Sequence, residues 1–206
     1  MAYSDFTLAD VKKKFGIVEK RTALFENVNT LPMSDWLKET LDTGLYLALA
    51  SSSEKARSEF IIVPILFEIH KKNDREFAIY SGETFDVDKE KGLSGECDFI
   101  LSKGELSHTI QSPVLALVEA KKKDMGKGIG QCAAQMVGAQ IFNTREENET
   151  DSVFGCVTTG EDWQFLKLSG DTLFIDSIRY YIDNVEKILG VLQAVIGFYI
   201  NDSERV

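Results

Sequence analysis

The chain has 206 residues, enough for one well-buried domain, and its 44% hydrophobic and 27% charged residues are ordinary for a soluble globular protein. The net charge of −10 argues against nonspecific adhesion to nucleic acid, which draws on clustered lysine and arginine, although a local basic groove stays compatible with it. With no apolar run of membrane-spanning length and no signal peptide, we expect a single cytoplasmic domain over residues 1–206 without membrane contact.

The first part of the chain is expected to be mainly helical. A short helix is predicted over residues 5–15, followed by an irregular or extended segment over 16–31. Ser34-Asp35 gives a helix start, and apolar residues recur at helical spacing from there to residue 50. A second helix is predicted over 53–71, with a kink or interruption at Pro64, because proline breaks the helical hydrogen-bond ladder.

Strands alternate with helices in the rest of the chain. The strands at 95–102 and 114–121 are nearly continuous apolar runs, which indicates a sheet covered on both faces. The apolar stripe of the last helix is attributed to core packing rather than to a dimer contact. This order predicts an α/β sandwich with a mixed central β-sheet flanked by helices. The predicted elements are strands at 77–80, 95–102 and 114–121, a helix at 126–142, strands at 153–159, 163–168 and 172–176, and a helix at 178–200.

The cysteines and histidines offer no metal site. Cys97, Cys132 and Cys156 lack metal-ligand spacing and stand in apolar contexts, so buried free thiols are expected rather than disulfides or zinc ligands. His70 and His108 are too far apart to argue for a histidine-based site.

The candidate site is an acid on one apolar strand and an acid-x-lysine triplet on the next. Side chains alternate between the faces of a strand, so Glu119 and Lys121 emerge side by side with the Ala120 carbonyl between them. Pairing of the two strands would add Asp98. Two carboxylates and a carbonyl make a hard oxygen site of the kind that Mg²⁺ prefers, and an ammonium beside it is suited to hold a water or a developing phosphorane charge. This is the chemistry of phosphodiester hydrolysis.

The triplet alone is weak evidence for a site. Asp10-Val11-Lys12 has the same spacing on a predicted helix, where residues two apart do not face each other. Charges buried at the end of a strand need partners, and a mutual ion pair between Glu119 and Lys121 would provide them without any catalysis. Both interpretations stand at this point.

Two helices are expected to supply supporting groups. Glu59 lies on the proline-interrupted helix amid apolar neighbours and could reach the same end of the sheet, although an exposed acid paired with Lys55 or Arg57 explains it equally well. Gln131 and Gln135 are one helical turn apart and share a face. Their amides are suited to hold a phosphate or orient the lysine, while buried hydrogen bonds and surface exposure are the alternatives.

These residues together resemble the restriction-endonuclease-like, PD-(D/E)XK nuclease superfamily. The resemblance covers about residues 54–168, from the helix that carries Glu59 to the strands that follow the helix of Gln131. Cys97 stands where the family often has the proline of its Pro-Asp pair. The segments around Asp98 and Gln131 are also similar to uncharacterised bacterial, often cyanobacterial, members of this superfamily.

The resemblance implies a restriction-endonuclease-like three-layer sandwich and a set of roles. The two acids and the Ala120 carbonyl would bind Mg²⁺ or Mn²⁺, the lysine would orient or deprotonate the attacking water, and the helix acid and Gln131 would support them. The implied catalytic set is Asp98, Glu119, Lys121, Glu59 and Gln131.

The first hypothesis is therefore a magnesium-dependent nuclease that acts on nucleic acid, with DNA ahead of RNA. The rival hypothesis is a catalytically quiet module of the same fold that acts in binding, assembly or regulation with a protein partner, which the acidic balance favours. A homodimer is compatible with either hypothesis.

Overall fold

The computed structural model describes residues 1–50, 53–148, 150 and 152–200. Its first half contains a 3-10 turn, two longer helices, one helix in three segments, and two strands: η1 (Tyr3–Asp5), α1 (Leu8–Phe15), β1 (Val18–Thr22), α2 (Asp35–Ala50), α3 (Glu54–Arg57), the π-helical η2 (Ser58–Ile62), α4 (Val63–Lys72) and β2 (Phe77–Thr84). The remaining elements are β3 (Glu96–Lys103), β4 (Val114–Ala120), α5 (Met125–Arg145), β5 (Ser152–Thr158), β6 (Asp162–Ser169), β7 (Thr172–Asp176), β8 (Tyr180–Tyr181), η3 (Ile182–Asn184) and α6 (Val185–Ile200).

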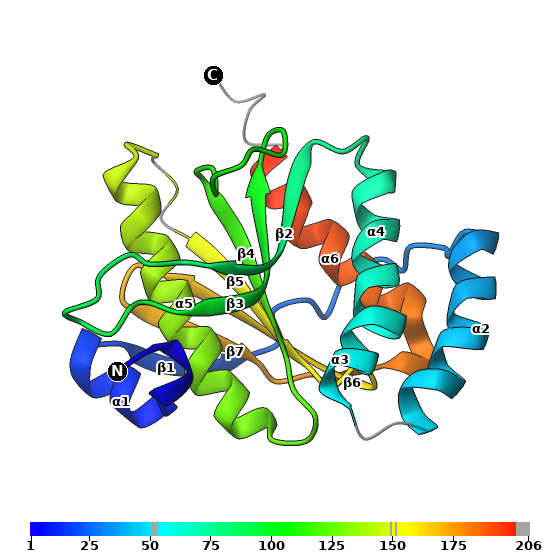
Figure 1. Ribbon diagram of the computed structural model, residues 1–206, viewed down its shortest axis with the longest axis horizontal. Coiled ribbons are helices and arrows are strands. Elements are labelled where there is room, and N and C mark those ends of the chain that lie inside the picture. Colours follow the sequence, from blue (N-terminus) through cyan, green and yellow to red (C-terminus); the bar gives the residue numbers. More distant parts are fainter. Residues whose placement is uncertain (51–52, 149, 151, 201–206) are drawn as a thin grey trace.

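A mixed eight-stranded sheet forms the centre of the molecule, in the order β1-β7-β6-β5-β4-β3-β2, with the short β8 beside β6. The β4–β5 and β1–β7 pairs are parallel and the other neighbours are antiparallel. Helix α5, with α1 beside it, covers one face of the sheet, and α4 and α6 cover the other (Figure 1). The predicted α/β architecture, with a mixed central sheet between helices, is confirmed.

The sheet separates two hydrophobic cores, one under α5 and one under α4 and α6. Every residue of β4 is buried, as its continuous apolar run predicted, and β3 is buried except for the exposed Glu96 and the partly buried Asp98 and Lys103. Every residue of β5 is buried as well. Leu189 and Ile196 of α6 are fully buried, which confirms that the stripe on the last helix is core packing. Burial of each such side chain contributes about 1.5–3 kcal/mol to folding. The three cysteines are buried and free, also as predicted.

Three predicted elements differ from those observed. The segment 16–31 contains the edge strand β1, whose exposed residues pair in parallel with β7 and give no hydrophobic pattern. The helix expected at 53–71 is interrupted as predicted, but by a π-helical turn, Ser58–Ile62, that ends before Pro64 rather than at it. The last helix begins at Val185 rather than at 178, because Tyr180 and Tyr181 pair with β6.

Local chemistry fixes the short helix α1. The Thr7 hydroxyl accepts from the Asp10 amide, and the Asp10 carboxylate accepts from the Thr7 amide, a capping box that satisfies the first turn. Gly16 ends the helix in the left-handed conformation. Asp10 therefore serves as a cap of this helix. Among the described residues, no helix is long and apolar enough to cross a membrane.

Candidate functional site

The register of β3 and β4 brings the two predicted acids together. Phe99 pairs with Val118, and both side chains belong to the core under α4 and α6. The next residue along each strand, Asp98 and Glu119, therefore lies on the opposite face, under α5. The two carboxyl groups are close enough for each to affect the pKa of the other. Asp98 therefore joins Glu119 through the pairing of β3 with β4, as the sequence predicted for paired strands.

Asp98 is held at the point where the β3–β4 ladder ends. The last paired residues are Phe99 and Val118, and beyond them the Ala120 amide donates to Asp98 Oδ2 at 2.8 Å. The Asp98 carboxylate thus accepts from the Ala120 amide, which would otherwise have no partner on the β3 side of the strand. This bond fixes the carboxylate beside the backbone of Ala120, which is itself buried.

Glu119 is buried, with 1% of its side chain exposed, and both of its oxygens accept hydrogen bonds. Lys121 Nζ lies 2.5 Å from Oε1, and Gln135 Nε2 lies 2.8 Å from Oε2. Glu119 and Lys121 therefore form the ion pair that the sequence offered as one interpretation, and Gln135 adds a further hydrogen bond to it. The remaining polar atom of Gln135, its buried Oε1, has no hydrogen-bond partner among the described residues.

The surroundings of the two acids favour their protonated forms. Burial raises the pKa of Glu119 to about 7, and the charge of Asp98 adds to the effect, while Lys121 and Gln135 oppose it. Burial also raises the pKa of Asp98, against the Ala120 amide and Lys121. For Lys121, burial lowers the pKa but the charges of Glu119 and Asp98 outweigh it, so the pKa is raised. Two neighbouring carboxyl groups in a buried site cannot both ionise cheaply unless a cation joins them.

The donor set fits a hard divalent ion better than a soft one. No group of three or more His, Cys, Asp or Glu side chains within the described part of the chain is arranged to hold a metal. An ion here would depend on the Asp98 and Glu119 carboxylates plus oxygens from backbone, water or substrate. Magnesium is commonly held in this way, by one or two carboxylates and several non-protein oxygens.

A cavity of about 430 Å³ opens onto this network. Asp98, Glu119 and Lys121 line it, and α5 contributes Gln131 from the predicted set and Lys127 from the lysine cluster after β4. The N-terminal segment closes one side, where the Tyr3 amide donates to the Ser94 carbonyl at 3.0 Å. Its lining residues are Ala2, Tyr3, Ser4, Glu54, Gly95, Glu96, Asp98, Glu119, Lys121, Lys127 and Gln131.

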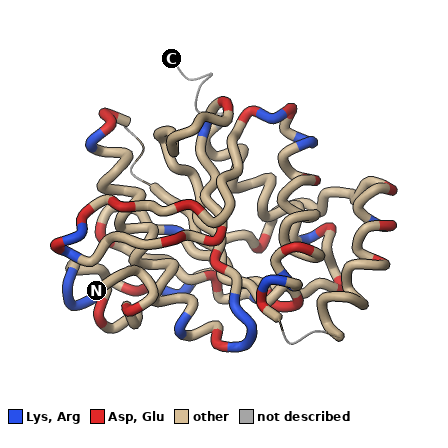
Figure 2. The backbone as a smooth tube through the Cα atoms, viewed as in Figure 1, with Lys and Arg blue, Asp and Glu red and all other residues tan. Residues whose placement is uncertain are grey.

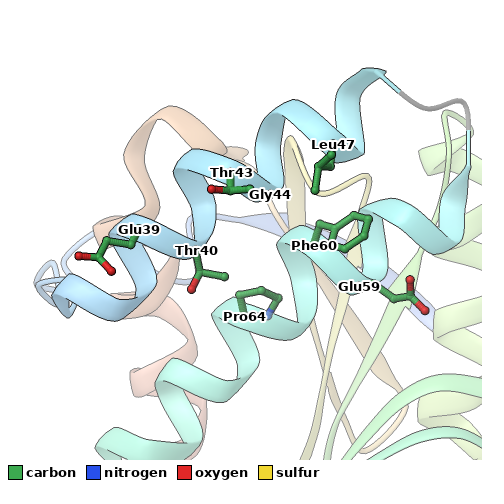
Figure 3. A pocket seen from close by; sticks show the side chains of 8 residues that line it. All are labelled: Glu39, Thr40, Thr43, Gly44, Leu47, Glu59, Phe60 and Pro64. Atoms are coloured by element: carbon green, nitrogen blue, oxygen red, sulfur yellow. The ribbon is translucent and has the colours of Figure 1, made fainter.

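Glu59 does not line this cavity. Its side chain is 52% exposed and lies 3.7 Å from Lys55, the helix-paired arrangement that the sequence offered as an alternative. It borders a neighbouring cavity of about 450 Å³, which Asp98 also lines. In Figure 3 the Glu59 side chain projects from the helix that follows α3, away from α2.

Glu54 occupies the position that the sequence analysis gave to Glu59. It lies in the first turn of α3, after the Ser53 cap, and lines the cavity with Asp98. Its Oε2 accepts from the Lys122 amide at 2.8 Å, which ties α3 to the loop after β4. Its charge contributes to the raised pKa of both Asp98 and Lys121. A capping serine followed by an acid was the available signal, but it does not say which helical acid faces the sheet.

Gly128 allows Lys121 to reach the site. A Cβ atom at Gly128 would lie 2.5 Å from Val157 Cγ1 and 3.0 Å from Lys121 Cγ. The absence of a side chain therefore lets the first turns of α5 approach β5 while the aliphatic part of Lys121 passes between them.

Charge is distributed unevenly around the site. Lysines gather in the loop between β4 and α5, whereas Asp and Glu recur along the β2–β3 hairpin (Figure 2). The loop is therefore the side of the cavity that is better suited to phosphate.

Comparison with known proteins finds a similarity over part of the chain. The chain matches no family model. A stretch of 97 residues is 29% identical to Crinkler effector protein 1 of Rhizophagus irregularis, and it covers 42% of this chain and 20% of that protein. The chain thus matches about a fifth of the length of that relative.

Proposed function

We propose that this protein is a magnesium-dependent nuclease with a restriction-endonuclease-like fold. The observation that carries the proposal is the meeting of Asp98, Glu119 and Lys121 in one cavity, where the charge of Asp98 raises the pKa of Glu119. The order of α3–α4, three strands, α5 and β5 supports the fold assignment, because it follows the core order implied by the sequence resemblance. The partial similarity to the Crinkler effector protein is compatible with the proposal but does not carry it.

In this proposal Asp98, Glu119 and the Ala120 carbonyl hold Mg²⁺ or Mn²⁺. A bound ion would lower the pKa of water and offset charge on the phosphate. Lys121 keeps its proton near neutral pH because its pKa is raised, so we assign it to orienting the attacking water and stabilising the phosphorane rather than to taking a proton. Gln131 and Lys127 supply donors for the phosphate.

The substrate proposed is nucleic acid, and the resemblance rather than the geometry puts DNA ahead of RNA. The lysine loop after β4 supports a phosphate path on one side of the cavity. A cytoplasmic location and a homodimer or protein complex remain predictions from the sequence.

A cleavage assay tests the proposal. Purified protein with Mg²⁺ or Mn²⁺ is expected to cut at least one of single-stranded, duplex or branched DNA or RNA. Lys121→Ala is expected to abolish cleavage with an unchanged circular dichroism spectrum. Lys89→Ala, which alters a 75% exposed lysine of the β2–β3 connection that does not line the cavity, should retain it. Absence of cleavage on every substrate, together with no heat of metal binding by calorimetry, would contradict the proposal.

A second candidate function is a catalytically quiet module of the same fold. One observation favours it: both oxygens of Glu119 already accept from Lys121 and Gln135, so the network is satisfied there without an ion. The two candidates differ in their response to metal. A metal site predicts that Mn²⁺ raises the melting temperature of the parent and not of Asp98→Asn, whereas a purely structural site predicts no effect of Mn²⁺ on either protein.

A further inference from the structure

A groove lies between α2 and the η2–α4 segment (Figure 3). Its volume is about 360 Å³, within the range of sites that accept small apolar groups. It is separate from the cavity of Asp98 and Glu119. Its lining residues are Glu39, Thr40, Thr43, Gly44, Leu47, Glu59, Phe60 and Pro64.

The floor of the groove is a close contact between its two helical segments. A methyl group at Gly44 would collide with the carbonyl oxygen of Phe60, so α2 approaches the π-helical turn through its backbone. Pro64 presents only its ring from the first turn of α4. Leu47 and Phe60 stand beside these two positions and form apolar walls.

The two apolar walls of the groove stay partly exposed. Leu47 on α2 is 43% exposed, and Phe60 on the facing segment is 37% exposed. Single exposed apolar residues are normal on a protein surface, but two that line one hollow indicate an interaction site.

The charge of the groove restricts what can occupy it. Glu39 and Glu59 lie at its opposite ends, and no lysine or arginine of the described part of the chain lines it. Lys55, near Glu59, is 80% exposed and its pairing is weak in water. An acidic rim repels nucleic acid and anionic membranes and attracts a cationic partner.

The described part of a second copy does not offer such a partner in an accessible form. Its helices with an apolar side and a basic turn are α1, which carries Lys12, Lys13 and Lys14, and α4, which ends on Lys71 and Lys72 and whose Ile65 and Ile69 are fully buried. The apolar side of α1 is already used within the chain, since Val11 is fully buried in the core under α5.

We propose that the groove binds a helical segment of a different protein, with an apolar anchor flanked on both sides by lysine or arginine. Grooves between helices commonly take amphipathic helices through apolar anchors. The anchor would lie over Gly44 between Leu47 and Phe60, and the basic side chains would reach Glu39 and Glu59. This interaction does not depend on the proposed nuclease activity.

Selection from a random library of phage-displayed peptides, with the full chain immobilised, tests the proposal. Enriched peptides are expected to combine an apolar residue with flanking basic residues. Their synthetic versions should bind in a fluorescence anisotropy titration, and Leu47→Glu and the double variant Glu39→Lys/Glu59→Lys should each weaken binding by about tenfold or more. Leu106→Glu, which alters a 69% exposed leucine in the β3–β4 connection, should leave binding unchanged.

Several results would overturn the proposal. The first is no enrichment of any peptide, and the second is enrichment of peptides without basic residues. The third is a peptide that binds the double variant Glu39→Lys/Glu59→Lys as tightly as the parent, when the circular dichroism spectrum of the variant matches that of the parent. Concentration-dependent dimerisation that Leu47→Glu abolishes would assign the groove to a second copy, and would overturn it as well.

Discussion

The buried carboxyl of Glu119 predicts a measurable dependence of stability on pH. Burial raises its pKa from an ordinary 4.5 to about 7. Between these values the folded protein holds a proton that the unfolded chain has released, so the free energy of unfolding falls as pH rises through this window. At about 1.4 kcal/mol per pH unit, the difference amounts to about 3 kcal/mol. This contribution is complete below pH 4.5 and is lost above pH 7.

Glu119→Gln removes the titrating group and keeps a partner for Gln135. The stability of the variant relative to the parent should therefore increase by about 3 kcal/mol between pH 4 and pH 8, which is about 6–12 °C in melting temperature for a chain of this size. Urea unfolding at each pH, followed by fluorescence of the buried Trp163, measures it. Glu105→Gln, on the exposed β3–β4 connection, serves as the control. Parallel pH profiles for Glu119→Gln and the parent would refute the reasoning.

Two further predictions concern packing and buried polar groups. Gly128→Ala should destabilise the fold by about 1–3 kcal/mol and displace Lys121, because the new Cβ would lie 2.5 Å from Val157. Gly126→Ala is the control: its Cβ would make only an ordinary 3.5 Å contact, so this variant should be neutral or stabilised by up to about 1 kcal/mol. Equal urea midpoints for the two variants would contradict this prediction. Asp176→Ala should lower the free energy of unfolding by about 2–4 kcal/mol in the same urea assay, because this buried carboxylate accepts hydrogen bonds from two backbone amides and a buried tyrosine hydroxyl. A loss below about 1 kcal/mol would contradict this prediction.

The central part of the fold was predictable because its signals are local. Continuous apolar runs identified β3 and β4, and strand alternation placed Glu119 and Lys121 on one side. The hairpin between neighbouring antiparallel strands then brought Asp98 close. These steps need only periodicity and sequence proximity.

What the sequence did not predict depends on tertiary packing. The choice between Glu54 and Glu59 is set by how a helix with a π-helical turn lies against the sheet, which its apolar spacing does not encode. The start of α6 was misplaced because Ile178 continues the helical spacing by coincidence, while Tyr180 and Tyr181 are held by long-range pairing to β6. The edge strand β1 is defined by its partner rather than by its own residues.

The central claim is that Asp98 and Glu119 share a divalent cation. A crystal soaked in Mn²⁺ tests it directly, through the anomalous difference density at this site. We expect one peak in contact with both carboxylates, at about 2.0–2.2 Å from their oxygens, as for small hard cations. No peak at a saturating Mn²⁺ concentration, with Lys121 and Gln135 still bonded to Glu119, would contradict the account.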